Sequence, residues 1–504
     1  MNESVELRIA SGTLMLGVSQ IMAIVLGVIF SVIVARLLGP ESYGLVGISL
    51  TYPTLVASLL DLGLGSAIAR YVAMSSEDRK LYAWTGTLAK LLFGALGAII
   101  VYACADFFAY LLARPYIAQL VKVLSTYVAA TCVLGGVQSA FSGLGKYSLA
   151  GSIAVSQYAL RGTLTVALIL TGLGSYGAVA SFSIAYAILG VVYSLLFIKL
   201  FKKPKFSKKA LKKMLTLSIP LYTAALVQLV VGPAINTVLA QYSTNVELGN
   251  YSVAISSLAP INAVVVSIST AALTSLPILI GDSDILQKKT MQIAIYSSII
   301  LIATILGYIS ILTPLVYLLY GVEYKSAPIY AIAYAAGIAV NAILTGGILG
   351  SFFITVDSTK WNCLLGIASC TSTILSALIL IPTYSALGAA IAQSIGSTVS
   401  GAAAYIIARR NFSINISLKD CLRGLMPAAI ASKVAHIVMC PLGCNIITAL
   451  IVAGVSYIAI YLAILPLIVN KKDIRNVIEL TSKLAYIGKL IEPLGKAYLR
   501  LVKA

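Results

Sequence analysis

The sequence predicts an all-α membrane protein with about fourteen transmembrane helices, arranged as two six-helix lobes around a central cavity plus two additional C-terminal helices. Three observations support this prediction: the apolar composition, the lengths of the apolar segments, and a duplication in which the second half of the chain echoes the first. Of the 504 residues, 60% are hydrophobic and only 10% are charged. Such a composition is far outside the range of a water-soluble domain.

The apolar segments have the length that a bilayer requires. Hydrocarbon about 30 Å thick is crossed by roughly 20 helical residues, each rising about 1.5 Å. The first segment is too long for a signal-peptide core, so we expect an uncleaved first span. Between charged or turn-rich breaks the predicted spans are 11–36, 44–70, 85–112, 117–143, 147–171, 176–199, 214–240, 248–280, 290–319, 326–354, 360–381, 385–408, 420–440 and 445–469.

Lysine and arginine are distributed unequally between alternate loops. If the N-terminus is inside, most of the 35 basic residues, Lys90 among them, fall on inner loops and on the C-terminal tail. This bias predicts a multi-pass protein of the cell membrane with both termini cytoplasmic. The net charge of +19 then describes an inner face near anionic lipids, which we expect as partners, and not a nucleic-acid site.

The duplication is visible in short matches that keep a nearly constant spacing. Tyr110-Leu-Leu recurs as Tyr317-Leu-Leu, and Pro53 recurs as Pro260 at the same spacing. A repeat of six spans, an even number, gives both copies the same orientation, as in transporters built from parallel repeats. The predicted parts are an N-terminal lobe at 1–200, a basic cytoplasmic linker at 201–213, a C-terminal lobe at 214–410, two additional helices at 411–470, and a basic amphipathic tail at 471–504.

Two motifs near the start of the chain carry a family resemblance. Ala35-Arg-Leu-Leu-Gly-Pro-Glu-Ser-Tyr-Gly44 and Asp61-Leu-Gly-Leu-Gly-Ser-Ala-Ile-Ala-Arg-Tyr-Val-Ala73 resemble the polysaccharide flippase family. That family belongs to the multidrug/oligosaccharidyl-lipid/polysaccharide exporter superfamily. The resemblance implies a flippase that moves a lipid-linked oligosaccharide or polysaccharide precursor, on an isoprenoid (pyro)phosphate carrier, from the inner to the outer leaflet. It implies the lipid-linked glycan as substrate and glycan-assembly enzymes as further partners.

Two ionisable residues are expected deep within the first lobe. Asp61 precedes Arg70 by nine residues, and Arg161 lies about fourteen residues along its span, so rises of about 13 Å and 21 Å place both in hydrocarbon. Such charges are usually paired or face a cavity. One interpretation is an Asp61–Arg161 ion pair that only locks two spans together. A second is a substrate site, in which Arg161 binds the carrier phosphate and Asp61 holds or releases it. A third is local capping or snorkelling of these charges.

Further candidates lie elsewhere in the spans. Lys433 and His436 are one helical turn apart and are predicted either to contact a phosphate or sugar acid or to form a buried polar pair. Among uncharged polar residues, which either hydrogen-bond between helices or line a sugar-sized cavity, we assign Gln157 and Asn262 to substrate binding. The others are Gln20, Gln138, Gln228, Asn236, Asn341 and Gln393. Four deep tyrosines, Tyr52, Tyr127, Tyr158 and Tyr186, are candidates for stacking on sugar rings.

We expect no cofactor and no enzymatic activity. The sequence has no P-loop motif, and its one histidine excludes a multi-histidine metal site. Cys440 and Cys444 bracket a short predicted outer loop, and the sequence leaves open whether they form a disulfide.

Two alternative functions are weaker. A cation-coupled antiporter for small amphipathic solutes should have a deep carboxylate cluster, whereas only Asp61 is available. A membrane-embedded glycosyltransferase or ligase of the same pathway would need an acidic catalytic pair and a sizeable outer loop, and neither is seen.

Overall fold

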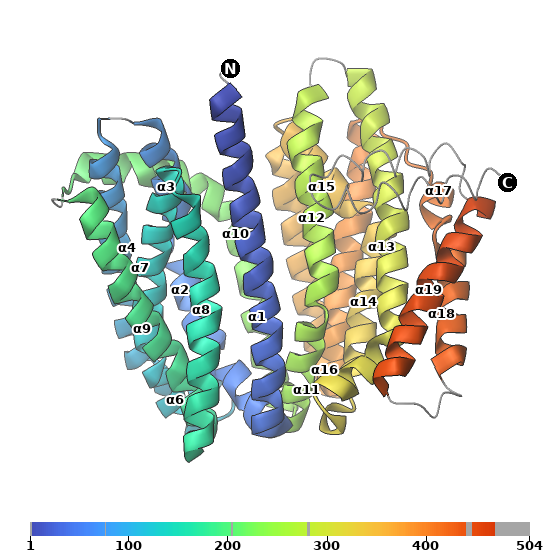
Figure 1. Ribbon diagram of the computed structural model, residues 1–504, viewed down its shortest axis with the longest axis horizontal. Coiled ribbons are helices and arrows are strands. Elements are labelled where there is room, and N and C mark those ends of the chain that lie inside the picture. The colour runs from blue at the N-terminus through green and yellow to red at the C-terminus, as the bar shows by residue number, and fades with distance from the viewer. Residues whose placement is uncertain (1–2, 76, 203–204, 280–282, 440–445, 469–504) are drawn as a thin grey trace. The chain divides into compact units, whose positions relative to one another are not determined.

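The computed structural model describes residues 3–75, 77–202, 205–279, 283–439 and 446–468, and within them every regular element is a helix (Figure 1). The predicted tail and the Cys440–Cys444 pair lie outside these residues. The all-α class predicted from the sequence is therefore confirmed. The α-helices of the first half are α1 (Glu3–Ser49), α2 (Thr51–Leu59), α3 (Leu64–Met74), α4 (Arg79–Ala103), α5 (Ala105–Leu111), α6 (Ala118–Val123), α7 (Ser125–Gly143), α8 (Tyr147–Leu168), α9 (Gly174–Phe201) and α10 (Lys208–Tyr242).

The second half continues in the same way. Its helices are α11 (Asn245–Ser257), α12 (Ala259–Ser275), α13 (Ser283–Leu319), α14 (Ala327–Ile343), α15 (Gly346–Thr355), α16 (Thr359–Asn411), α17 (Leu418–Leu422), α18 (Leu425–Met439) and α19 (Ile446–Ile468). Short turns of tighter or wider helix are η1 (Pro115–Ile117), η2 (Ile169–Leu173), η3 (Leu276–Leu279) and η4 (Val322–Tyr324).

These helices are long and apolar enough to make the chain a multi-pass membrane protein. The described residues contain nine such stretches, or ten if α14 and α15, which meet at a bend of 50°, form one span. Three of the stretches have 45, 55 and 53 residues, about twice what a bilayer needs, and each covers two predicted spans. Together with the apolar segment Leu226–Tyr242 of α10, they agree with the prediction of about fourteen spans.

Backbone irregularities recur at the spacing of the predicted repeat. Gly174 has φ 48° and ψ −131°, and Ser385, its counterpart in the second copy, has φ 50° and ψ −128°. The turns η1 and η4 stand at the same spacing as Pro53 and Pro260. Positive φ angles also recur at corresponding positions: Ala113 and Gly321, Gly145 and Asp357, Lys202 and Ser413. The repeat seen in the sequence is therefore also a repeat of backbone conformation.

Gly174 allows this backbone requirement to be tested. Its φ and ψ lie in a region that residues with a side chain avoid, and a Cβ added there would meet nothing within 4 Å. Gly174→Ala should therefore lower the free energy of unfolding by about 1–3 kcal/mol through backbone strain alone, measured by denaturation of the purified protein in detergent. Ser385→Gly, at the equivalent position, should stabilise it. Wild-type stability for both variants would contradict the shared conformation.

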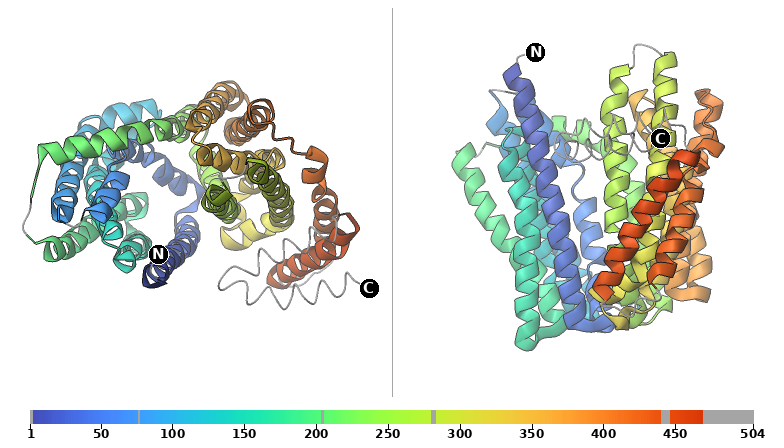
Figure 2. Two further views of the ribbon diagram at one scale, coloured as in Figure 1. Left: turned by 90° about the horizontal axis from the view of Figure 1, so that it is seen from above. Right: turned by 45° about the vertical axis from the view of Figure 1, so that its right-hand side comes forward.

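The chain divides into two compact units, each with its own core. The first comprises Met1–Ser256, Glu323–Ala327 and Ile374–Ala389, and the second Ser257–Val322, Pro328–Thr373 and Ala390–Ala504. Helices α4, α7, α8 and α9 of the first unit run side by side, as two further views show (Figure 2). The lobe boundaries predicted from the sequence stay a prediction.

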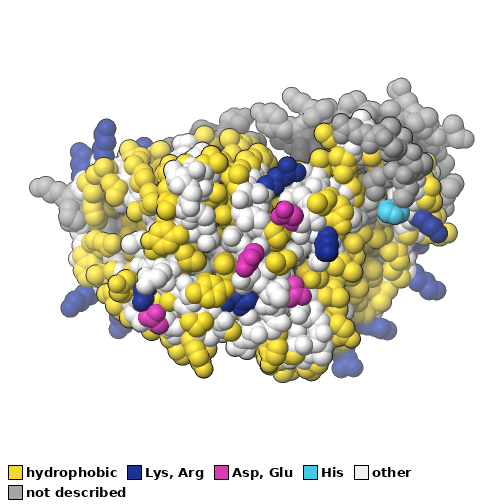
Figure 3. Space-filling model, turned by 90° about the horizontal axis from the view of Figure 1, so that it is seen from below, with side chains coloured by type: hydrophobic (Ala, Val, Ile, Leu, Met, Phe, Trp, Pro, Cys, Tyr) yellow, Lys and Arg dark blue, Asp and Glu magenta, His cyan; other side chains and the backbone are white. Residues whose placement is uncertain are grey.

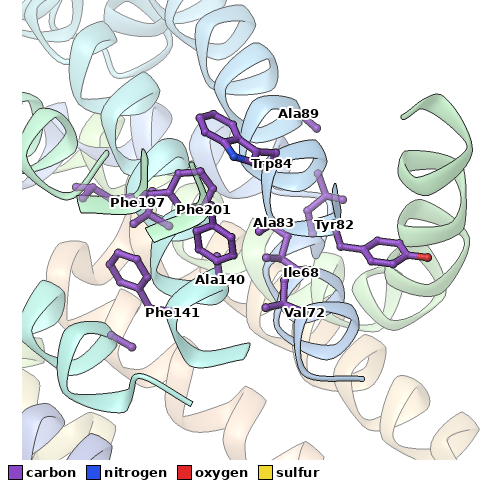
Figure 4. Packing of buried hydrophobic residues seen from close by; sticks show 14 of the residues in the cluster. Ile68, Val72, Tyr82, Ala83, Trp84, Ala89, Ala140, Phe141, Phe197 and Phe201 are labelled. Carbon is purple, nitrogen blue, oxygen red and sulfur yellow. The ribbon is translucent and has the colours of Figure 1, made fainter. Parts of the chain in front are cut away.

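The core of the first unit is rich in aromatic side chains. Trp84 of α4 meets Phe197 of α9 edge-on, with ring centroids 4.9 Å apart, and Phe201 lies 4.6 Å from Phe197 (Figure 4). Phe141 and Ile68 are fully buried in the same cluster. Such buried rings fix the positions of α3, α4, α7 and α9.

The outer surface is apolar as well. Large side chains such as Ile21, Leu92 and Ile99 are about two-thirds exposed. The face toward the helix ends in Figure 3 differs, because charged side chains lie there among the hydrophobic ones. Exposed apolar side chains on this scale suit contact with lipid tails.

Candidate functional site

A polar cavity of the first unit contains an ion pair between a buried lysine and a partly exposed aspartate. We call it the ion-pair cavity; it measures about 790 Å³ and is lined by α1, α3, α4, α7, α8 and the break before α3. Asp61 and Lys90 form an ion pair inside it, with Lys90 only 3% exposed and Asp61 35% exposed. Gln20, Gln138 and Ser139 add uncharged polar groups to the wall.

A break between α2 and α3 places the Asp61 carboxylate. Leu62 and Gly63 adopt φ of 47° and 67°, so the helix cannot continue through them. The Asp61 backbone remains satisfied: its N–H donates to the Ser58 carbonyl at 3.2 Å, and its carbonyl accepts from the Leu64 N–H at 2.9 Å. The side chain is thereby free to project from the break into the cavity.

Glycines make room for the Lys90 side chain. Lys90 lies eleven residues into α4, a rise of about 16 Å. A Cβ at Gly135 would lie 2.9 Å from its Nζ, and one at Gly136 would lie 3.3 Å from its Cδ. The lysine stem therefore runs along a glycine-lined face of α7 to reach Asp61.

This arrangement differs from the sequence-based expectation in two respects. The proposed Asp61–Arg161 ion pair is wrong, because Asp61 pairs with Lys90. Lys90 is also no inner-loop charge, since it lies within a helix and is buried. The sequence could have indicated this position for Lys90, because the predicted span 85–112 includes it.

Arg161 occupies a second cavity of the first unit, the Arg161 cavity, of about 240 Å³. Its guanidinium carbon lies 4.9 Å from the centroid of the Tyr158 ring and 4.7 Å from that of Phe182. In the described part of the chain, no carboxylate forms an ion pair with Arg161. Two aromatic faces thus stabilise a cation whose charge is not neutralised.

The surroundings of Arg161 are aromatic and hydroxylated. Tyr127 contacts both Phe182 and Tyr186 edge-on, at 5.9 Å and 4.8 Å between centroids. Three of the four deep tyrosines named from the sequence therefore gather near one arginine. The hydroxyl-bearing residues of the cavity wall are Ser31, Tyr43, Thr165, Ser252 and Ser256.

Gln157, half-buried, lies on α8 one turn before Arg161. Asn262, by contrast, belongs to the second unit, where it lines a cavity of about 220 Å³ together with Tyr334, Asn341 and Thr345. None of the residues lining this cavity is ionisable at neutral pH, and we call it the neutral cavity. Asn262 and Asn341 were named from the sequence, whereas Thr345 was missed because its role depends on a helix break.

Lys433 and His436 share a face of α18, as their spacing predicts, but both are exposed. The interpretation as a buried polar pair is therefore wrong. Helix α18 packs through Ala431 and Ala435, which lie in a small cluster with Tyr457 of α19, so the basic face is left pointing outward.

Comparison with known proteins places the chain in a family. A family model described as polysaccharide biosynthesis protein matches residues 33–328. The chain belongs to this polysaccharide biosynthesis protein family. A search of curated proteins finds no match.

Solved structures show which fold this family member has. The chain is similar to the lipid II flippase MurJ in an inward closed conformation, with a TM-score of 0.73 and 16% identity over 89% of this chain and 98% of that one. It is also similar to an inward-facing multidrug resistance MATE family transporter of the MOP superfamily, with a TM-score of 0.65 and 17% identity over 77% of this chain and 94% of that one. A MOP superfamily transporter from Pyrococcus furiosus also matches, with a TM-score of 0.56 and 18% identity over 81% of this chain and 95% of that one. The family member thus has the MOP-superfamily transporter fold.

Proposed function

We propose that this protein is a flippase that moves a lipid-linked oligosaccharide or polysaccharide precursor from the inner to the outer leaflet by alternating access. The polysaccharide biosynthesis family and the fold shared with a lipid II flippase support this proposal. It depends most on Arg161, an un-neutralised guanidinium in a membrane span that faces a cavity. A charge in that position is energetically costly, and charged residues that remain within membrane spans usually mark a substrate site or pathway.

The chemistry of Arg161 suits the carrier phosphate. A guanidinium offers forked hydrogen bonds that match two phosphate oxygens. Lys90 suits this role less well, because Asp61 already neutralises its charge. Gln157, one turn away on α8, is proposed to contact the adjoining sugar. Lys433 and His436 lie on the exposed face of α18. We propose that their side chains extend along the helix surface to contact anionic lipid headgroups.

The remaining predictions fit this proposal. We propose a cell-membrane location with both termini cytoplasmic, anionic lipids at the inner face, and glycan-assembly enzymes as partners. The proposed lobes at 1–200 and 214–410, with the two helices at 411–470, follow the sequence repeat.

A reconstituted system tests the proposal. Purified protein in liposomes should increase the rate at which a fluorescent isoprenoid-pyrophosphate oligosaccharide reaches the opposite leaflet, measured by quenching from outside. A rate equal to that of empty liposomes would refute the flippase assignment.

A second candidate, a cation-coupled antiporter, is favoured by one observation: the deep Asp61 carboxylate faces a cavity and is 35% exposed. If coupling operates there, an imposed pH or sodium gradient should accelerate export of a small amphipathic dye. Asp61→Asn should remove that acceleration.

A further inference from the structure

The neutral cavity of the second unit is the repeat counterpart of the ion-pair cavity of the first. Lys90 and Ser297 stand at the spacing of the sequence repeat, as do Gly135 and Ala342, and all four line their respective cavities. Ser269, which lines the neutral cavity, stands one position past the strict counterpart of Asp61. The neutral cavity is thus lined by residues at the same repeat positions as the ion-pair cavity, but it has serine hydroxyls at or next to the positions of Lys90 and Asp61.

The polar groups of the neutral cavity have unused hydrogen-bonding capacity. Thr345 is 2% exposed, lies at the break between α14 and α15 with φ 55°, and its Oγ1 is buried without a hydrogen-bond partner among the described residues. Within the same residues, no hydrogen bond is made by the side chains of Asn262, Ser269 or Tyr334. An orphaned buried hydroxyl is unfavourable unless something else satisfies it.

One wall residue is held in a fixed orientation. The Asn341 amide Nδ2 donates to the Ser397 carbonyl at 2.7 Å, which leaves Oδ1 as an acceptor. The set therefore combines an oriented amide, a second amide, hydroxyls that both donate and accept, and the Tyr334 ring.

We infer that the neutral cavity binds an uncharged sugar residue of the transported glycan; this inference rests on the proposed function. Hydroxyls and amides match the mixed donors and acceptors of a sugar ring, and an aromatic face can cover its apolar C–H groups. The volume of about 220 Å³ is several times the roughly 30 Å³ of one water molecule, enough for a ring. A bare monovalent cation would leave most of that volume unfilled, and the wall offers it no carboxylate.

Binding can be measured directly on the full chain in detergent. The probes are methyl glycosides of glucose, galactose, mannose and N-acetylglucosamine, followed by saturation-transfer NMR, and sodium and potassium chloride, followed by titration calorimetry because these cations carry no protons. Thr345→Val keeps the β-branched shape and removes only the hydroxyl, so it should weaken the best glycoside roughly 3- to 10-fold. Combining it with Asn262→Ala should weaken binding by more than about 10-fold.

The matched control is Ser267→Ala on the same helix α12 as Asn262. Ser267 is exposed and its hydroxyl donates to the Ala263 carbonyl, its one hydrogen bond among the described residues, so glycoside binding should be unchanged. Absence of binding by all four glycosides, or equal binding by wild type and both cavity variants, would overturn the inference. So would a signal that depends on sodium or potassium alone.

Transport separates this inference from the function on which it rests. Thr345→Val should slow the flipping of lipid-linked oligosaccharide but leave flipping of the glycan-free carrier phosphate unchanged. If wild type flips neither lipid, the proposed function fails. If wild type flips the oligosaccharide and Thr345→Val does so equally fast, only the sugar subsite fails.

Discussion

Asp61→Ala should destabilise the protein by about 3–5 kcal/mol, because it leaves a buried lysine without its counter-charge. Lys90 is 3% exposed and its side chain is confined against glycines of α7, so its ammonium group has little access to solvent that could replace the carboxylate. Lys90→Met should cost less, since the carboxylate that it leaves behind is 35% exposed. The measurement is the denaturation midpoint of each variant in the same detergent.

Two comparisons make this expectation specific. Asp61→Leu combined with Lys90→Met should recover much of the lost stability, because removing both charges removes the desolvation cost of each. Asp106→Ala is the matched control: it breaks the Lys122–Asp106 pair, in which Asp106 is 72% exposed, and should change stability by about 0–1 kcal/mol. Equal losses for Asp61→Ala and Asp106→Ala would contradict the buried ion pair.

Arg161→Ala should reduce the flipping rate at least tenfold, because charge-assisted hydrogen bonds to a phosphate are worth about 1.5–3 kcal/mol each. Arg161→Lys should give an intermediate rate, since it keeps the charge but loses the forked geometry and the stacking on Tyr158 and Phe182. Rates are compared at equal amounts of reconstituted protein.

Lys213→Ala controls for the loss of a cation–π contact. Lys213 lies 5.2 Å from the Tyr71 ring and 6.0 Å from the Tyr82 ring but is exposed, so its removal should leave the rate unchanged. Wild-type flipping by Arg161→Ala would remove this arginine from the mechanism.

The sequence was sufficient to predict the helical class, the approximate number of spans and the repeat, because bilayer thickness and backbone satisfaction restrict what an apolar chain can form. Ser385 has nearly the same φ and ψ as Gly174 although the residue type differs. The two copies therefore share backbone conformation at positions where their sequences differ. Arg161 was identified because a lone charge in an apolar span is conspicuous.

Pairing was not predictable in the same way. Only Arg161 was considered as a partner of Asp61, because Lys90 was counted among the inner-loop charges. The pairing with Lys90 depends on the glycines of α7 that admit its stem. Thr345 was missed because a hydroxyl becomes significant only when a helix break buries it without a partner. Exposure of Lys433 and His436 depends on which face α18 turns toward its neighbours, and helical spacing leaves that undetermined.

Lipid selectivity is the decisive property of the proposed flippase. Liposomes containing the purified protein are loaded in parallel with a fluorescent lipid-linked oligosaccharide and with a fluorescent phosphatidylcholine, and the access of each to an external quencher is followed. We predict that the protein accelerates exchange of the lipid-linked oligosaccharide between leaflets and leaves phosphatidylcholine unaffected. Equal exchange of both lipids, or exchange of neither above empty liposomes, would contradict this function.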